Sequence, residues 1–116
     1  MESLMRLDVR EVPGALILTV IGEIDVLTAP RLRAAVSECL DRADGVVVVD
    51  LVQVSFLSSH GLAALASAAK ESASSRYKAP MRLVVDENRP VVRPLQITGL
   101  DHLLALYDSI GDALAV

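Results

Sequence analysis

The chain has 116 residues and a mass of 12.4 kDa, the size of one domain, so a second independent core is not expected. Hydrophobic residues make up 53% of the sequence and charged residues 22%, which excludes a disordered chain. The net charge is −4 and only 3% of residues are aromatic, so the basic groups and stacking rings of a nucleic-acid-binding surface are missing.

The first elements in chain order are predicted to be two paired strands. Residues 5–9 alternate between apolar and polar side chains, as in a strand buried on one face. After the turn signal Pro13-Gly14, residues 15–21 are almost entirely apolar, which predicts a strand buried on both faces.

A helix and a central strand are predicted next. Apolar residues recur at helical spacing over residues 32–40, with Thr28 at the expected N-cap position. Gly45 is expected to end this helix in the left-handed conformation. The run of β-branched residues at 46–51 predicts a central parallel strand with helices on both faces.

The second half of the chain predicts three further helices and two strands. An alanine-rich apolar stripe over residues 62–73 predicts a helix that the serine-rich residues 72–75 close. A strand is expected at residues 81–85, and then a helix from residue 88 or 89 to residue 97, which Pro94 makes short or bent. A short strand at residues 103–107 and a last small helix from residue 109 complete the chain.

This order of elements predicts an α/β fold with one domain over residues 1–116. Strands that alternate with helices favour a mostly parallel central sheet, packed with about four helices. The Pro-Gly turn makes the first strand antiparallel to the second.

Cysteine content and hydropathy narrow the class of protein further. The single cysteine, Cys39, excludes an internal disulfide and a multi-thiolate metal site, and its place on an apolar stripe predicts a buried thiol. The apolar stretches are far shorter than the ~20 residues that span a bilayer, and the N-terminus lacks the apolar region of a signal peptide. We therefore expect a cytoplasmic protein that does not bind membranes.

The residues best suited to chemistry lie between residues 50 and 62. This segment is expected to run from the end of the central strand across a loop into a helix, the edge of an α/β sheet where functional groups gather. It contains Ser58, Ser59 and His60, and one of the serines is expected to be the helix N-cap. Glu23 and Asp25 follow the preceding strand and should reach the same edge. Asp25 either braces its loop, caps the helix or contacts a partner.

Two enzymatic or signalling alternatives fit this segment poorly. A serine hydrolase would need the G-x-S-x-G turn, whereas Leu57 stands where its first glycine belongs, and His102 is expected on the surface. A phospho-acceptor domain using Asp50 would need an acidic pair after its first strand and a lysine after its last strand. Both alternatives remain distant ones.

Four short motifs together indicate a family. In chain order they are Gly22-Glu-Ile-Asp25 followed by Thr28-Ala29, then Val-Asp50-Leu-x-x-Val-x-Phe-Leu57, then Ser59-x-Gly61-Leu62, then Thr98-Gly99-Leu100. At these spacings the whole chain resembles a STAS domain of the free-standing bacterial anti-sigma factor antagonists.

The resemblance implies a protein-binding switch and not an enzyme, with no cofactor and no metal. Family members bind an anti-sigma factor that is also a serine kinase, which releases a sigma factor. The kinase phosphorylates one serine and a phosphatase reverses this. The partner-binding residues that it implies are Glu23, Asp25, Thr28, Ser58, Ser59, His60, Gly61 and Leu62.

The phosphate acceptor that the resemblance implies is Ser59. The family motif reads Asp-Ser-Ser-Gly-Leu, so its aspartate is replaced here by Ser58 and its second serine by His60. Ser58 is therefore an alternative acceptor. An antagonist that is not phosphorylated, or is regulated differently, is the second interpretation.

Overall fold

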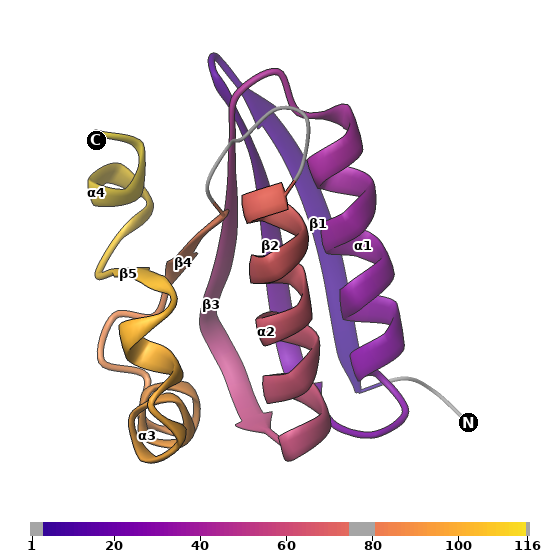
Figure 1. The fold of residues 1–116 in the computed structure, drawn as a ribbon, viewed down its shortest axis with the longest axis vertical. Helices are drawn as coiled ribbons and strands as arrows, with labels where there is room; N and C mark the ends of the chain where they lie inside the picture. Colours follow the sequence, from indigo (N-terminus) through magenta and orange to yellow (C-terminus); the bar gives the residue numbers. More distant parts are fainter. Residues whose placement is uncertain (1–3, 75–80, 116) are drawn as a thin grey trace.

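The structure, a computed structural model, describes residues 4–74 and 81–115. These residues form one five-stranded sheet whose strands lie in chain order, with only β1 antiparallel to its neighbour (Figure 1). The α/β fold and the antiparallel first strand are thereby confirmed. The elements are β1 (Met5–Val12), β2 (Ala15–Ile24), α1 (Ala29–Arg42), β3 (Val46–Leu57), α2 (Ser59–Ser74), β4 (Met81–Val84), α3 (Arg89–Thr98), the 3-10 turn η1 (Leu100–His102), β5 (Ala105–Tyr107) and α4 (Ile110–Leu114).

The two faces of the sheet are covered unequally. Helices α1 and α2 lie side by side across one face, where the main aliphatic core forms around residues such as Leu18, Val49 and Leu65 (Figure 1). On the other face Val48 packs in a smaller cluster with Ala113 of α4. Both faces of β3 are thus covered where its sequence is continuously apolar, as predicted for a central parallel strand.

Strand β3 is longer than predicted. Residues 52–57, expected as a loop, continue the strand, so that Asp50 is a buried mid-strand residue and not a strand end. Two bulges lie in this extension, because residues 50–53 lie opposite residues 19–21 of β2 and residues 54–56 lie opposite residues 22–23. The sequence carried a strand signal here, since Val52, Val54 and Phe56 alternate with polar residues. The bulged strand does not follow that alternation, because it buries every third residue, Leu51, Val54 and Leu57, and exposes Val52 and Phe56.

Asn88 completes the edge of β3 that β4 leaves uncovered. Strand β4 ends at Val84, and the Nδ2 atom of Asn88 lies 2.7–3.1 Å from the carbonyl oxygens of Leu51, Val52 and Val54. Asn88 is also the N-cap residue of α3, but its side chain makes no capping hydrogen bond. Its amide therefore stabilises the extended end of β3.

Gly45 differs from its prediction. It does not adopt the left-handed conformation, and α1 ends instead at the extended residue Ala43. A Cβ atom at residue 45 would overlap the carbonyl oxygen of Gly14, so a close approach between two turns requires glycine here.

The buried stripe of α2 is also shifted from its prediction. Ala64, Ala68 and Ser72 are buried, whereas Ala73 is exposed. Residue 75 of the serine-rich segment lies outside the described residues. Cys39 is buried as expected. No helix in the described ranges is both long and apolar enough to cross a membrane.

We predict that Asn88→Asp destabilises the fold. A carboxylate facing three carbonyl oxygens cannot donate to them. Two of the three hydrogen bonds are partly buried and one is exposed, so we expect a loss of about 1 kcal/mol or more. Urea denaturation of Asn88→Asp and wild type gives the difference in unfolding free energy.

The matched control is Gln96→Glu, which makes the same amide-to-acid change at an exposed residue of the same helix. This control should stay within about 0.5 kcal/mol of wild type. Equal effects of the two substitutions would show that Asn88 does not support β3.

Candidate functional site

The two serines at the β3–α2 junction have different environments. Ser58 is half-buried, and its backbone N–H donates to the Ile24 carbonyl oxygen over 2.9 Å. The Ser58 hydroxyl accepts a hydrogen bond from the Gly61 N–H over 3.2 Å, the geometry of an N-cap. Ser59 is the first residue of α2 and is exposed. The structure thus settles the N-cap as Ser58 and leaves the Ser59 hydroxyl at the surface.

Gly61 fixes the start of α2 against the sheet. A Cβ atom at this residue would lie 2.5 Å from Leu57 Cδ1 and 2.7 Å from Ile24 Cγ2. Gly61 is buried and Leu62 is half-buried against the core. Both residues position the helix and offer little surface to a partner.

Asp25 and Thr28 hold the turn between β2 and α1. The Oδ1 atom of Asp25 accepts from the backbone N–H groups of Leu27 and Thr28 over 2.9 and 3.0 Å. The Thr28 hydroxyl donates to the Glu23 carbonyl oxygen and accepts from the Asp25 N–H, over 2.9 and 2.8 Å. Asp25 therefore braces the loop. Thr28 occupies the predicted N-cap position of α1, but its buried hydroxyl serves the turn and not the helix.

The same hydrogen bonds shift the ionisation of Asp25. The backbone N–H of Thr28 is the largest influence that lowers its pKa below the ordinary value of 3.8, helped by the Thr28 hydroxyl and the Leu27 N–H. Asp25 is thus a structural carboxylate that stays charged under ordinary conditions.

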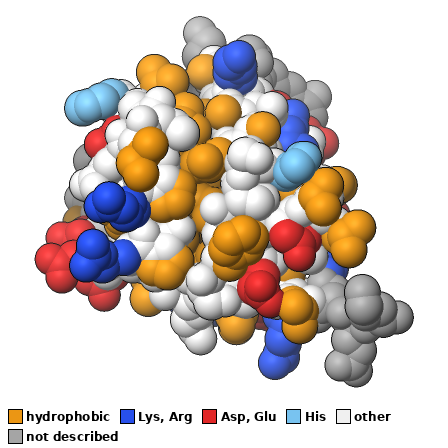
Figure 2. All heavy atoms as spheres, turned by 90° about the horizontal axis from the view of Figure 1, so that it is seen from below, with side chains coloured by type: hydrophobic (Ala, Val, Ile, Leu, Met, Phe, Trp, Pro, Cys, Tyr) orange, Lys and Arg blue, Asp and Glu red, His pale blue; other side chains and the backbone are white. Residues whose placement is uncertain are grey.

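The predicted site residues come together at one edge of the sheet. Glu23 pairs with Phe56, and Ile24 pairs with Leu57, so the β2–α1 turn lies beside the β3–α2 junction. Viewed from below, this face carries hydrophobic side chains interspersed with acidic ones (Figure 2). Ser59 and His60 are exposed here, while Glu23 and Asp25 are half-buried.

Three exposed apolar residues at this edge were not singled out from the sequence. Val26 and Leu27 lie in the β2–α1 turn and Phe56 lies near the end of β3, with 56%, 71% and 48% of their surfaces exposed. Two adjacent apolar residues inside a predicted turn are the signal that was available for Val26 and Leu27. Phe56 lies in the segment that was expected to be a loop and that the structure shows as the end of β3.

The structure gives the hydrolase alternative no support. Among the described residues, no hydrogen bond joins the Ser59 hydroxyl to a histidine. His102 is exposed in η1, which packs against α3 and β5, and its Nε2 atom lies 3.8 Å from Asp101 Oδ1. Within the same residues, no cluster of three or more His, Cys, Asp or Glu side chains is placed to hold a metal ion.

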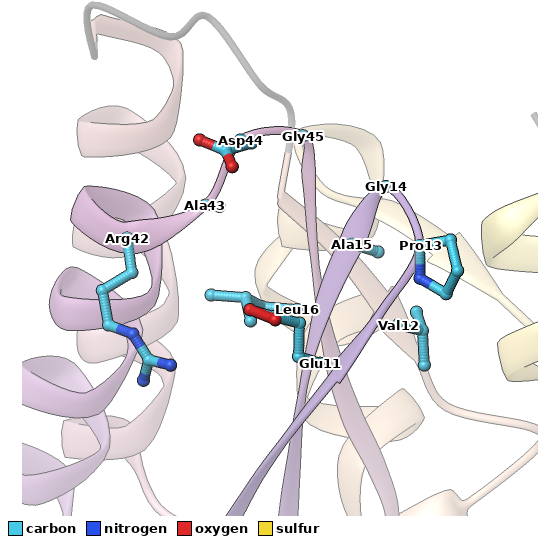
Figure 3. Close-up of a pocket in the computed structure, with 10 residues that line it drawn as sticks. All are labelled: Glu11, Val12, Pro13, Gly14, Ala15, Leu16, Arg42, Ala43, Asp44 and Gly45. Carbon is cyan, nitrogen blue, oxygen red and sulfur yellow. The ribbon is translucent and has the colours of Figure 1, made fainter.

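A hollow of about 450 Å³ lies at the opposite end of the sheet from Ser59. The β1–β2 turn and the end of α1 enclose it, with Glu11 and Arg42 on opposite sides (Figure 3). It adjoins the amino ends of the parallel strands β2 and β3, whereas functional groups of such sheets gather at the carboxyl ends. The edge with Ser59 is therefore the better candidate site.

Residues 6–113 match the family model of the STAS domain, so the chain belongs to the STAS domain family. This confirms the resemblance found in the motifs.

Relatives cover most of the chain. It is 34% identical over 101 residues to the anti-sigma-F factor antagonist RsfB of Mycobacterium tuberculosis, across 87% of this chain and 80% of that protein. It is 31% identical over 94 residues to the anti-sigma-B factor antagonist of Listeria monocytogenes, across 80% of this chain and 79% of that protein. The crystal structure of an anti-sigma factor antagonist from Mycobacterium paratuberculosis superposes with a TM-score of 0.84 at 32% identity, covering 96% of this chain and 92% of that one.

We predict that the β2–α1 turn loosens only in strong acid. Because the folded pKa of Asp25 is lowered, its stabilising hydrogen bonds are fully present above pH 3.8 and are lost as the pH falls through the folded pKa. An NMR titration should show the amide signals of Leu27 and Thr28 shifting with a midpoint below 3.8.

Asp25→Asn is the control for this titration. Its amide oxygen can accept the same hydrogen bonds but does not titrate in this range, so the two amide signals should stay in place. A wild-type midpoint at or above 3.8 would contradict the role given to Asp25.

Proposed function

We propose that this protein is an anti-sigma factor antagonist, which binds an anti-sigma factor and thereby frees a sigma factor for transcription. The observation that carries the proposal is the exposed Ser59 hydroxyl on the first residue of the 16-residue helix α2. The names of the relatives support an anti-sigma factor as the partner, since each relative is named as an antagonist of an anti-sigma factor. The protein would act in the cytoplasm, where sigma factors act, as a binding module and not as an enzyme.

Ser59 is the proposed phosphate acceptor, and the partner is proposed to be its serine kinase. A kinase must bring the hydroxyl into its own active site, and the exposed Ser59 allows this. The Ser58 hydroxyl is engaged with the Gly61 N–H, so its modification would cost α2 its N-cap. Ser59 is therefore favoured over Ser58 on physical grounds.

Phosphate on Ser59 would change the surface and preserve the fold. It adds about −1.5 to −2 charges at neutral pH. A helix N-terminus presents free N–H groups and partial positive charge, which stabilise an anion there. A partner that packs against this edge would meet a bulky dianion, and a phosphatase would restore binding.

Ser58 and His60 support a second candidate, an antagonist that is not phosphorylated. They replace the aspartate and the second serine of the family motif, which removes a negative charge next to the acceptor. Glu23 and Asp25 place other carboxylates at the same edge. The Asp25 carboxylate accepts hydrogen bonds within the β2–α1 turn, so it does not replace the aspartate of the motif. A kinase assay separates the two candidates.

We predict that Ser59→Glu abolishes binding to the anti-sigma factor, whereas Ser59→Ala binds like wild type. The carboxylate imitates the charge of a phosphate, and alanine only removes a hydroxyl. Isothermal titration against each purified anti-sigma factor of the source genome measures the affinities.

Ala73→Glu is the matched control for Ser59→Glu. It adds the same charge to an exposed residue of the same helix, about 21 Å away at a rise of 1.5 Å per residue. It should bind like wild type, and circular dichroism should show that all variants are folded. Wild-type affinity in Ser59→Glu would contradict the switch.

We also predict that the anti-sigma factor that binds this protein phosphorylates it at Ser59 in the presence of ATP. Mass spectrometry of the product should show one phosphate on wild type and on Ser58→Ala, and none on Ser59→Ala. A phosphate on Ser58 would reassign the acceptor, and no phosphate on either serine would favour the second candidate.

A further inference from the structure

The turn between β2 and α1 presents two large apolar side chains to solvent. Val26 and Leu27 are 56% and 71% exposed. Single exposed apolar residues are common on protein surfaces, but adjacent ones beside a further apolar surface indicate an interaction site.

This turn is held in one conformation. Asp25 Oδ1 binds the N–H groups of Leu27 and Thr28, and the Thr28 hydroxyl links both ends of the turn. These bonds use backbone groups and the Asp25 and Thr28 side chains, so the Leu27 side chain takes no part in them. An apolar side chain on a preorganised turn loses little entropy when it binds, which is favourable for an anchor residue.

A shallow groove of about 260 Å³ adjoins the turn, between the first halves of α1 and α2. Most of its side chains are small or apolar; it is lined by Val26, Ala29, Pro30, Arg33, His60, Ala63, Ala64 and Ser67. Glu71 of α2 binds Arg33 and Ser37 of α1, the latter over 2.7 Å, and so holds the two helices together. These contacts bridge α1 and α2 at one end of the groove, which Arg33 also lines.

The groove begins one helical turn from Ser59. Ser59 does not line it, but Ala63 does, and residues four apart are neighbours on the surface of a helix. Val26 belongs to both the turn and the groove. A partner that covers Ser59 would therefore also cover the turn-and-groove surface, meaning Val26, Leu27 and the groove.

We propose that the anti-sigma factor docks on this turn-and-groove surface through apolar contacts. Leu27 enters an apolar pocket of the anti-sigma factor, and an apolar side chain of the anti-sigma factor lies in the groove. The inference rests on the proposed function and adds to it a division of roles: the turn-and-groove surface supplies affinity, and Ser59 supplies control.

Leu27→Ala tests the anchor. We expect it to bind the anti-sigma factor at least tenfold more weakly than wild type in isothermal titration, with unchanged circular dichroism. The matched control is Leu103→Ala, since Leu103 is 77% exposed and lies beside the second half of α2, near Ala69 and Ala73. This control should bind like wild type.

Ala63→Leu tests the groove. The larger side chain at this exposed helical residue fills the groove, and we expect affinity to fall at least tenfold. Ala73→Leu makes the same change at the far end of the helix and should bind like wild type.

The outcomes separate the two proposals. If wild type and Ser59→Ala bind an anti-sigma factor while Leu27→Ala and Ala63→Leu bind equally well, the docking inference is overturned and the proposed function stands. If no anti-sigma factor binds wild type, the proposed function is wrong and the inference falls with it. Loss of binding in both variants, with both controls unaffected, supports the inference.

Discussion

The candidate site depends on the extension of β3 beyond its neighbour β4. The extension stays paired with β2, but on the side that β4 leaves its carbonyl groups lack strand partners, and acceptors withdrawn from water without donors are costly. Asn88 supplies the missing donors from the start of α3. The extension then carries the chain to the level of Ile24, where the Ser58 N–H binds the Ile24 carbonyl oxygen and α2 begins. The position of Ser59 thus follows from how one strand edge is completed.

The fold could be predicted from local signals, because most of the chain obeys simple periodicities. The β-branched run starting at Val46 marked the central strand, and the stripe ending near Leu40 marked α1. The end of β3 carried the alternation of Val52, Val54 and Phe56 with polar residues, which favours a strand. Which of these side chains are buried could not be predicted, since two bulges leave Val52 and Phe56 exposed. The hydrogen bonds of Asn88 to β3 could not be predicted from the sequence either, because the acceptors lie 34–37 residues earlier in the chain.

The sequence predicted which residues lie at the candidate site, but not which of them hold the structure and which face solvent. Ser58 and Ser59 are adjacent and chemically identical, yet one hydroxyl caps α2 and the other is exposed. Asp25 is among the residues that the family resemblance placed in the interface, but the structure shows that it binds the turn. The apolar Leu27 that this turn presents carries no recognisable chemistry in the sequence. Which side chain faces outward is decided by hydrogen bonds that only the folded chain reveals.

The proposed division of roles would allow a phosphate on Ser59 to switch binding without a change of fold. Burying a leucine side chain in a partner stabilises a complex by about 1.5–3 kcal/mol. Removing a charged group from water without a partner charge costs several kcal/mol. A phosphate on Ser59 would lie at the border of the turn-and-groove surface, so its desolvation would outweigh the contact made by Leu27. In the free protein the same phosphate stays in water beside the N-terminus of α2, where the helix dipole favours it. The proposed switch would then act on the complex alone.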